Sequence, residues 1–162
     1  MEPPLPSRPY FNVQLANKMK TLTIFYDPSC GLCVKFRGWL ETQPKRVAVE
    51  FLAFDSAAAS ERFPGLLELG AERDVVVMAD DGRWWQGSAA WLTCLWTTMQ
   101  YRDWSFRLAT PVFQPFVKKA VHLLSENRLT LSRLMRLRND AELATAIRSL
   151  PDASCTNNLC KI

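Results

Sequence analysis

The sequence has few of the residues that mark several common functional classes. A single histidine, His122, excludes a metal site built from several imidazoles, and five cysteines in 162 residues are too few for a disulfide scaffold. No apolar run reaches the roughly 18 residues of a membrane-spanning helix. The net charge of +4 is modest for a nucleic-acid-binding domain. We therefore expect a protein with no membrane span and no nucleic-acid partner.

Length and composition indicate one folded domain with short tails. Of the 162 residues, 48% are hydrophobic and 22% are charged, and a chain of this length folds without disulfides. Residues 1–20 carry four prolines and no continuous apolar stretch, which predicts a disordered arm without a signal peptide. Met19 is a candidate for the natural start. We expect a domain over residues 21–150 and a flexible tail over residues 151–162.

The first hundred residues alternate between strand-like and helix-like patterns. β-Branched and aromatic residues predict strands at 21–26, 47–54, 75–79 and 84–86, and the Asp81-Gly82 pair predicts a hairpin between the last two. Apolar spacing predicts helices at 31–41 and 56–62, and Ser88 is a candidate N-cap for a helix that runs to Tyr101. The order implies a right-handed parallel crossover followed by an antiparallel edge, and thus a mixed four-stranded α/β sheet flanked by helices.

The last third of the chain is predicted to be helical. Apolar residues recur with a period of about 3.6 over residues 111–127, and the pattern continues over residues 129–137. Asn139 and Glu142 have the spacing of a capping box before a final helix, which ends at Pro151. These segments would add C-terminal helices to the sheet domain.

Two further groups of residues have simple structural interpretations. Basic side chains interleaved with acidic ones predict a solvated helix face: Lys118, Lys119, Arg128, Arg133, Arg136, Arg138 and Arg148. A cluster of tryptophans in a stretch with almost no charge predicts core packing: Trp84, Trp85, Trp91, Trp96 and Trp104. Cys94, in the same stretch, is predicted to be a small buried hydrophobic residue.

The pair Cys30-Gly-Leu-Cys33 carries the chemistry of this sequence. It lies where a predicted strand ends and a helix begins, and the free N–H groups of a helix N-terminus stabilise a thiolate. We expect Cys30 to be exposed at the helix start and Cys33 to be more buried, on the face of Phe36 and Leu40. Cys30 would then attack a disulfide and Cys33 would resolve the mixed disulfide.

A family resemblance follows from this motif. The segment Asp27-Pro-Ser-Cys30-Gly-Leu-Cys33 after an apolar strand resembles the DCC family of thioredoxin-like thiol-disulfide oxidoreductases, which is named for Asp-x-x-Cys-x-x-Cys. Similar secondary landmarks are Asp81-Gly-Arg83, Gly87-Ser-Ala-Ala90 and, more weakly, Asn127-Arg128, so the resemblance spans residues 21–134. It implies a thioredoxin-like fold, a nucleophilic Cys30 and a resolving Cys33. Thioredoxins carry a cis-proline opposite the cysteines, but residues 73–74 contain no proline.

The expected substrate is a disulfide-containing protein or a small thiol in a reducing cytoplasm, with no metal or organic cofactor. Asp27 supports the site in one of two ways: as an Asx-turn residue whose carboxylate caps the helix, which we favour, or as a proton relay.

The tail holds a second cysteine pair. Cys155 and Cys160 are separated by four residues in a turn-like segment, so they could shuttle electrons to Cys30 and Cys33 or have no role. The alternative function is a non-enzymatic, zinc-stabilised interaction module in which Cys30, Cys33, Cys155 and Cys160 bind the metal.

Overall fold

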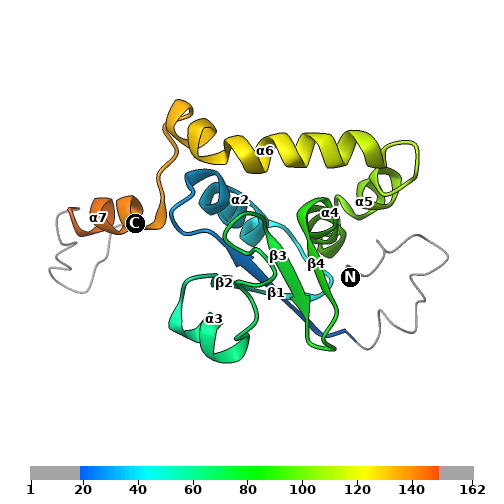
Figure 1. Ribbon diagram of the computed structural model, residues 1–162, viewed down its shortest axis with the longest axis horizontal. Coiled ribbons are helices and arrows are strands. Elements are labelled where there is room, and N and C mark those ends of the chain that lie inside the picture. The colour runs from blue at the N-terminus through cyan, green and yellow to red at the C-terminus, as the bar shows by residue number, and fades with distance from the viewer. Residues whose placement is uncertain (1–18, 150–162) are drawn as a thin grey trace, which may run out of the picture.

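The computed structural model describes residues 19–149 (Figure 1). Its strands are β1 (Thr21–Tyr26), β2 (Ala48–Ala53), β3 (Val76–Ala79) and β4 (Trp84–Gln86). Its helices are α2 (Gly31–Thr42), α3 (Ala57–Arg62), α4 (Gly87–Thr97), α5 (Arg102–Leu108), α6 (Gln114–Leu134) and α7 (Asp140–Arg148). The predicted α/β architecture, a mixed four-stranded sheet with additional C-terminal helices, is confirmed.

The four strands form one mixed sheet in the order β2-β1-β3-β4. β1 pairs in parallel with β2, as the crossover through α2 requires, and antiparallel with β3, which itself pairs antiparallel with β4. Gly82 has a φ of 88°, which the predicted hairpin turn needs, and its N–H donates to the Ala79 carbonyl at 3.0 Å. Because β1 is central, five of its six residues are buried.

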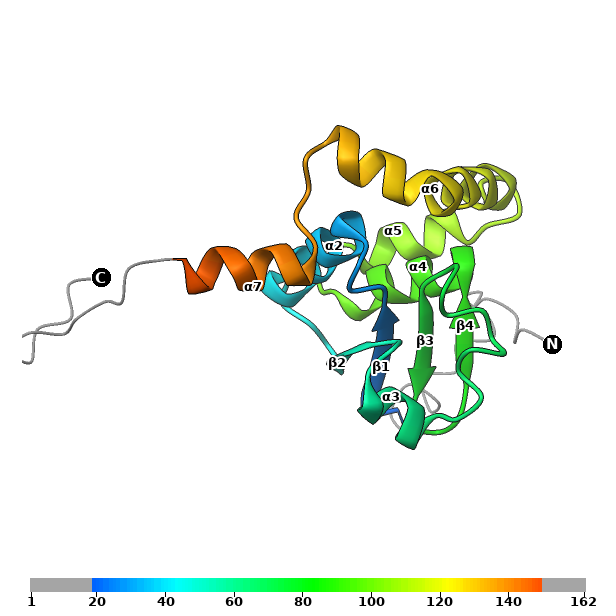
Figure 2. The same cartoon turned by 60° about the vertical axis from the view of Figure 1, so that its left-hand side comes forward.

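Both faces of the sheet are covered, and alternation along β1 assigns its side chains to them. Leu22 and Ile24 belong to the larger core cluster, which α2 and α4 cover with Leu40, Trp96 and other residues. Phe25 points the other way, into the smaller cluster beneath α3. Figure 2 shows α2 and α4 on one side of the strands and α3 on the other. β1, which leads into the cysteine motif, is therefore covered on both faces, by α2 and α4 on one side and by α3 on the other.

The C-terminal helices lie over the end of the domain that carries this motif. α6 runs across α2 and α4 and contacts both helices (Figures 1 and 2). The predicted capping box opens α7: the Asn139 side chain accepts from the Glu142 N–H, and the Glu142 carboxylate accepts from the Asn139 N–H. The Asp140 N–H donates to the Pro28 carbonyl at 3.1 Å, which ties the start of α7 to the turn after β1.

Three sequence-based expectations differ from the structure. Gln86, and not Ser88, is the N-cap of α4, and it forms no side-chain capping bond. The helix also stops at Thr97, four residues before Tyr101, because the chain then enters a turn that leads into the separate helix α5. Among the tryptophans, Trp85 and Trp96 are buried as predicted, but Trp104 lies on the outer side of α5 and is 55% exposed.

The packed region begins slightly earlier than expected. Met19 is buried in the larger core cluster, and the Lys20 N–H donates to the Asp80 carboxylate. Within residues 19–149, no helix combines the length and the apolar character that crossing a bilayer requires.

Candidate active site

The cysteine motif occupies the turn between β1 and α2. The Cys30 N–H donates to the Asp27 carbonyl at 3.2 Å, which closes this turn, and Cys30 is the N-cap of α2. Its sulfur accepts a hydrogen bond from the Cys33 N–H at 3.3 Å. Cys30 Sγ thus takes the place of the side-chain oxygen that usually satisfies the free N–H groups of a helix start.

The expected exposure of Cys30 is wrong. Cys30 has no exposed surface, whereas 7% of Cys33 is exposed. The cause is tertiary: the Ser132 hydroxyl of α6 lies 3.9 Å from Cys30 Sγ, and the segment between α6 and α7 packs on Gly31. The sequence correctly places the pair at a helix N-terminus, but it does not show that a distant helix covers that terminus.

The pKa values of the two thiols are shifted in opposite directions. A hydrogen bond from the Cys33 thiol, supported by the Cys33 N–H, Ser132 and the charge of Arg128, lowers the pKa of Cys30 to about 6, although burial opposes the shift. The same sulfur–sulfur hydrogen bond holds the proton on Cys33, and burial acts in the same direction, so the pKa of Cys33 is raised. Cys30 is therefore the thiolate of the pair near neutral pH and Cys33 is the thiol.

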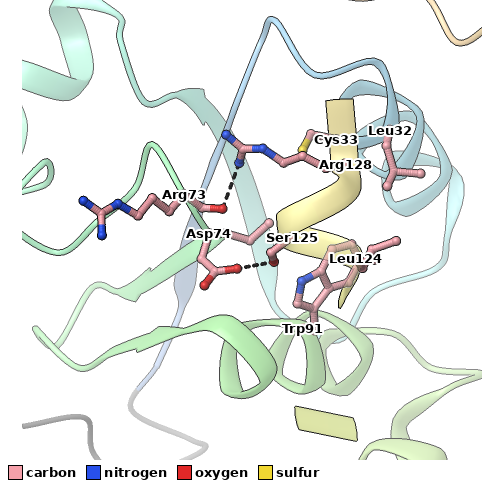
Figure 3. A pocket seen from close by; sticks show the side chains of 9 residues that line it. Leu32, Cys33, Arg73, Asp74, Trp91, Leu124, Ser125 and Arg128 are labelled. Carbon is pink, nitrogen blue, oxygen red and sulfur yellow. Dashed lines mark hydrogen bonds between the residues drawn. The ribbon is translucent and has the colours of Figure 1, made fainter. Parts of the chain in front are cut away.

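Arg128 lies beside the cysteines and connects three parts of the molecule. Its guanidinium forms an ion pair with Asp27 at 3.0 Å, with side chains only 15% and 7% exposed. It also donates to the backbone carbonyls of Glu72 and Arg73. Figure 3 shows the Arg128 side chain leaving α6, passing the Cys33 sulfur and reaching the Arg73 carbonyl. Arg128 is thus not on the solvated helix face that the sequence predicted.

Asp27 forms the predicted Asx turn, but it does not cap α2. One carboxylate oxygen accepts from the N–H and the hydroxyl of Ser29, at 2.8 and 2.6 Å. The other oxygen faces Arg128. Since the sulfur of Cys30 fills the capping position, the carboxylate is free to hold the arginine in place.

A narrow space separates α6 from the sheet at this point. It measures about 10 Å³, room for roughly one water molecule, and Cys33, Trp91 and Arg128 are among the residues around it. Its polar boundary includes Asp74, whose carboxylate accepts from the Ser125 hydroxyl (Figure 3). The interface between α6 and the domain is therefore close-packed near the cysteines.

The other predicted site residues stand apart from this arrangement. Cys94 is fully buried in α4, and burial raises the pKa of its thiol to about 12, which makes it unreactive. Cys155 and Cys160 lie outside the described residues. Over residues 19–149, no three histidine, cysteine, aspartate or glutamate side chains gather closely enough to hold a metal ion.

A family model described as DCC1-like thiol-disulfide oxidoreductase matches residues 24–134. The chain belongs to this family. The match runs from the second half of β1 to the end of α6 and so includes the cysteine motif, Asp27 and Arg128. Family membership supports a general thiol-disulfide oxidoreductase function and a thioredoxin-like fold, as the sequence indicated. Neither the search of curated proteins nor the search of solved structures finds a match.

Two residues of the site were not identified from the sequence. The sequence indicated Arg128 only as part of the weak Asn127-Arg128 landmark, which the family match includes, and as one of the basic residues of a solvated helix face. Ser132 gave no signal at all, because a serine on a helix with many polar residues has many ordinary roles. The segment before β3 lacks a cis-proline, as its sequence indicated, because the described chain has no cis peptide bond. The backbone carbonyls of Glu72 and Arg73 in this segment accept hydrogen bonds from Arg128.

Proposed function

We propose that this protein exchanges thiols and disulfides through Cys30 and Cys33. The Cys30 thiolate attacks one sulfur of a substrate disulfide, a mixed disulfide forms, and the other substrate sulfur leaves as a thiolate. Cys33 then gives up its proton and attacks the Cys30 sulfur, which releases the second substrate thiolate and closes the Cys30–Cys33 disulfide. The substrate gains two electrons and the protein loses two.

The observation that carries this proposal is the position of the Cys30 sulfur as the cap of α2. A thiolate there accepts from the Cys33 N–H and faces the positive end of a helix of 12 residues. When the thiolate becomes part of a mixed disulfide, its negative charge is lost. The Cys33 thiol, whose hydrogen bond to that charge had raised its pKa, can then lose its own proton.

Ser132 and Arg128 assist as positioning residues. At rest the Ser132 hydroxyl accepts from the Leu32 N–H at 2.9 Å and donates to the Arg128 carbonyl at 2.7 Å. The Arg128 charge favours the thiolate form of both cysteines. Asp27 holds that charge in place through its ion pair, so we assign it a structural role and not that of a proton relay.

Trapping tests the function and the order of the two cysteines. In a Cys33→Ser variant the mixed disulfide on Cys30 cannot be resolved, so it should accumulate when the reduced protein meets a disulfide. The matched Cys30→Ser variant should trap nothing, and Cys94→Ser should behave like the parent. Mass spectrometry after acid quenching identifies the linked residue. Accumulation on Cys33 or Cys94 instead would overturn the assignment.

A further inference from the structure

We propose that a recess beside Cys30 binds the carboxylate group of a small disulfide or thiol, with Arg136 as its recognition residue. This inference rests on the proposed function and names a substrate class for it. The recess has a volume of about 530 Å³ and lies between the start of α2 and the end of α6. That volume is in the range of small-molecule sites, and it is far too small for a folded protein.

The recess borders the reactive sulfur. Ser29 and Gly31, the two chain neighbours of Cys30, both line it. Ser132 lines it as well, and its hydroxyl lies 3.9 Å from Cys30 Sγ. A molecule in the recess therefore contacts both chain neighbours of Cys30 and the serine whose hydroxyl lies beside its sulfur.

The charge of the recess selects an anion. Arg133 and Arg136 line it, and Glu142 is its single carboxylate. Glu142 is already engaged, because it accepts from the Asn139 N–H in the capping box of α7. Within the described part of the chain the Arg136 guanidinium has neither a hydrogen bond nor an ion pair, so it is available to a carboxylate from solution.

The backbone at Arg136 supplies an independent argument. Its φ is 51°, in the left-handed region, at the position after the end of α6 where glycine is strongly preferred. The Arg136 N–H donates to the Arg133 carbonyl and the Leu137 N–H to the Ser132 carbonyl, the bonds of a Schellman motif. An arginine in this conformation costs conformational energy that glycine avoids, so its side chain has a use there.

The surrounding structure favours a small substrate over an extended polypeptide. The segment after α6 packs so closely on α2 that a Cβ at Gly31 would lie 2.5 Å from the Leu137 carbonyl oxygen. The carbonyls of Glu72 and Arg73, on the other side of the cysteines, are bonded to Arg128 and cannot pair with a peptide strand. A short molecule that enters through the recess avoids both obstacles.

The test compares small disulfides of different charge on the reduced full-length protein in single turnover. Each probe is reduced to two thiols while Cys30 and Cys33 form one disulfide, so no further reductant is needed. The probes are oxidised glutathione, which carries carboxylates, neutral hydroxyethyl disulfide and cationic cystamine. Each rate is divided by the rate of the same probe with free dithiothreitol. We expect the anionic probe to react fastest and cystamine slowest, and added salt to reduce the difference.

Three variants assign the preference to Arg136. Arg136→Gly should lower the normalised rate for oxidised glutathione about tenfold, leave the hydroxyethyl disulfide rate unchanged and melt no lower than the parent. Arg136→Lys should retain part of the preference. Arg138→Gln is the matched control, because Arg138 lies two residues away and lines the neighbouring groove instead of the recess.

The outcomes separate the two proposals. If the reduced protein reacts with none of the probes above the rate of Cys30→Ser, the proposed function fails. If it reacts with all three at equal normalised rates, or if Arg136→Gly keeps the full preference, only the recess proposal is overturned. A preference lost equally in Arg138→Gln would assign the effect to general charge and would also overturn it.

Discussion

The sulfur of Cys30 has two roles at once, because the Cys33 N–H that it caps in α2 is also one of the groups that stabilise its negative charge. An oxygen cap would give the helix the same bond, but it would not supply the nucleophile of the proposed function. Cys33, one turn later, shares the motif and yet holds its proton, since its thiol is the donor in the hydrogen bond to the Cys30 sulfur. Reactivity is therefore divided between two identical side chains by hydrogen-bond direction.

We expect alkylation of the reduced protein to show this division. The pKa of Cys30 is lowered to about 6, so its thiolate fraction rises as pH increases through 6 and is nearly complete at neutral pH. The Cys30 rate with iodoacetamide should fall about tenfold for each pH unit below that point. Cys33 and Cys94 should label far more slowly. Peptide mass spectrometry measures each rate, and earlier labelling of Cys33 would contradict the assignment.

The ion pair between Asp27 and Arg128 links the cysteine turn to α6. Both side chains are largely buried, so removal of one partner leaves a charge without compensation. We expect Arg128→Met to lower the free energy of unfolding by about 3 kcal/mol. It should also move the midpoint of Cys30 alkylation to higher pH, because the arginine charge lowers the pKa of Cys30.

A double-mutant cycle checks this link. Asp27→Asn keeps an acceptor for the Ser29 N–H, and Arg128→Met in that background no longer leaves a buried anion. The double variant should therefore be more stable than the sum of the single effects predicts, by more than about 0.5 kcal/mol. Additive effects in urea denaturation would show that the pair is not coupled.

Among the elements, the contact of α2 with the segment after α6 determines how well Cys30 is covered. Gly31 and Gly38 both lie in α2, but only Gly31 meets another backbone: nothing lies within 4 Å of a Cβ at Gly38. Helix propensity favours alanine at the interior position of Gly38 by up to about 1 kcal/mol, whereas Gly31 is the first residue of α2 and is packed against the Leu137 backbone.

We expect Gly38→Ala to stabilise the protein and Gly31→Ala to destabilise it. At Gly31 the added methyl group would displace the Leu137 backbone, at a cost of about 1–3 kcal/mol. The displaced segment should also uncover the sulfur, so Cys30 should be alkylated faster in Gly31→Ala and at the parent rate in Gly38→Ala. Thermal unfolding and labelling measure both effects. Equal stability of the two variants would show that the contact is not tight.

At the level of the whole molecule, the groups of residues 19–149 that lower the pKa of Cys30 come from two helices: Cys33 from α2, and Arg128 and Ser132 from α6. Helix α6 thus supplies two of the groups that surround the proposed exchange site.

A chain that ends at Asp152 should therefore keep the alkylation rate of Cys30 unchanged. Metal content and free thiols are measured on the same sample of the full chain before truncation. Slower turnover with an unchanged Cys30 rate would assign a shuttle role to Cys155 and Cys160. One equivalent of bound zinc, with four thiols that react only after a chelator is added, would contradict the proposed exchange function and support the zinc-stabilised module.

Local patterns in the sequence are sufficient to define the elements of the sheet and the place of the cysteine pair. The β-branched and aromatic strand at residues 21–26, the Asp81-Gly82 hairpin and the Asn139–Glu142 capping box depend on neighbours in the chain, so local patterns predict them. The position of Cys30 at a helix start is local in the same sense, and the short motif around it carries the resemblance to the family.

The surroundings of that pair depend instead on tertiary packing. Arg128 and Ser132 reach the cysteines from about 100 positions further along the chain, and their spacing from Cys30 carries no periodic signal. Burial of Cys30, the recess at Arg136 and the pairing of Asp27 all follow from where α6 packs. That packing depends on contacts between distant segments, whereas a sequence pattern reports only which face of a helix is apolar.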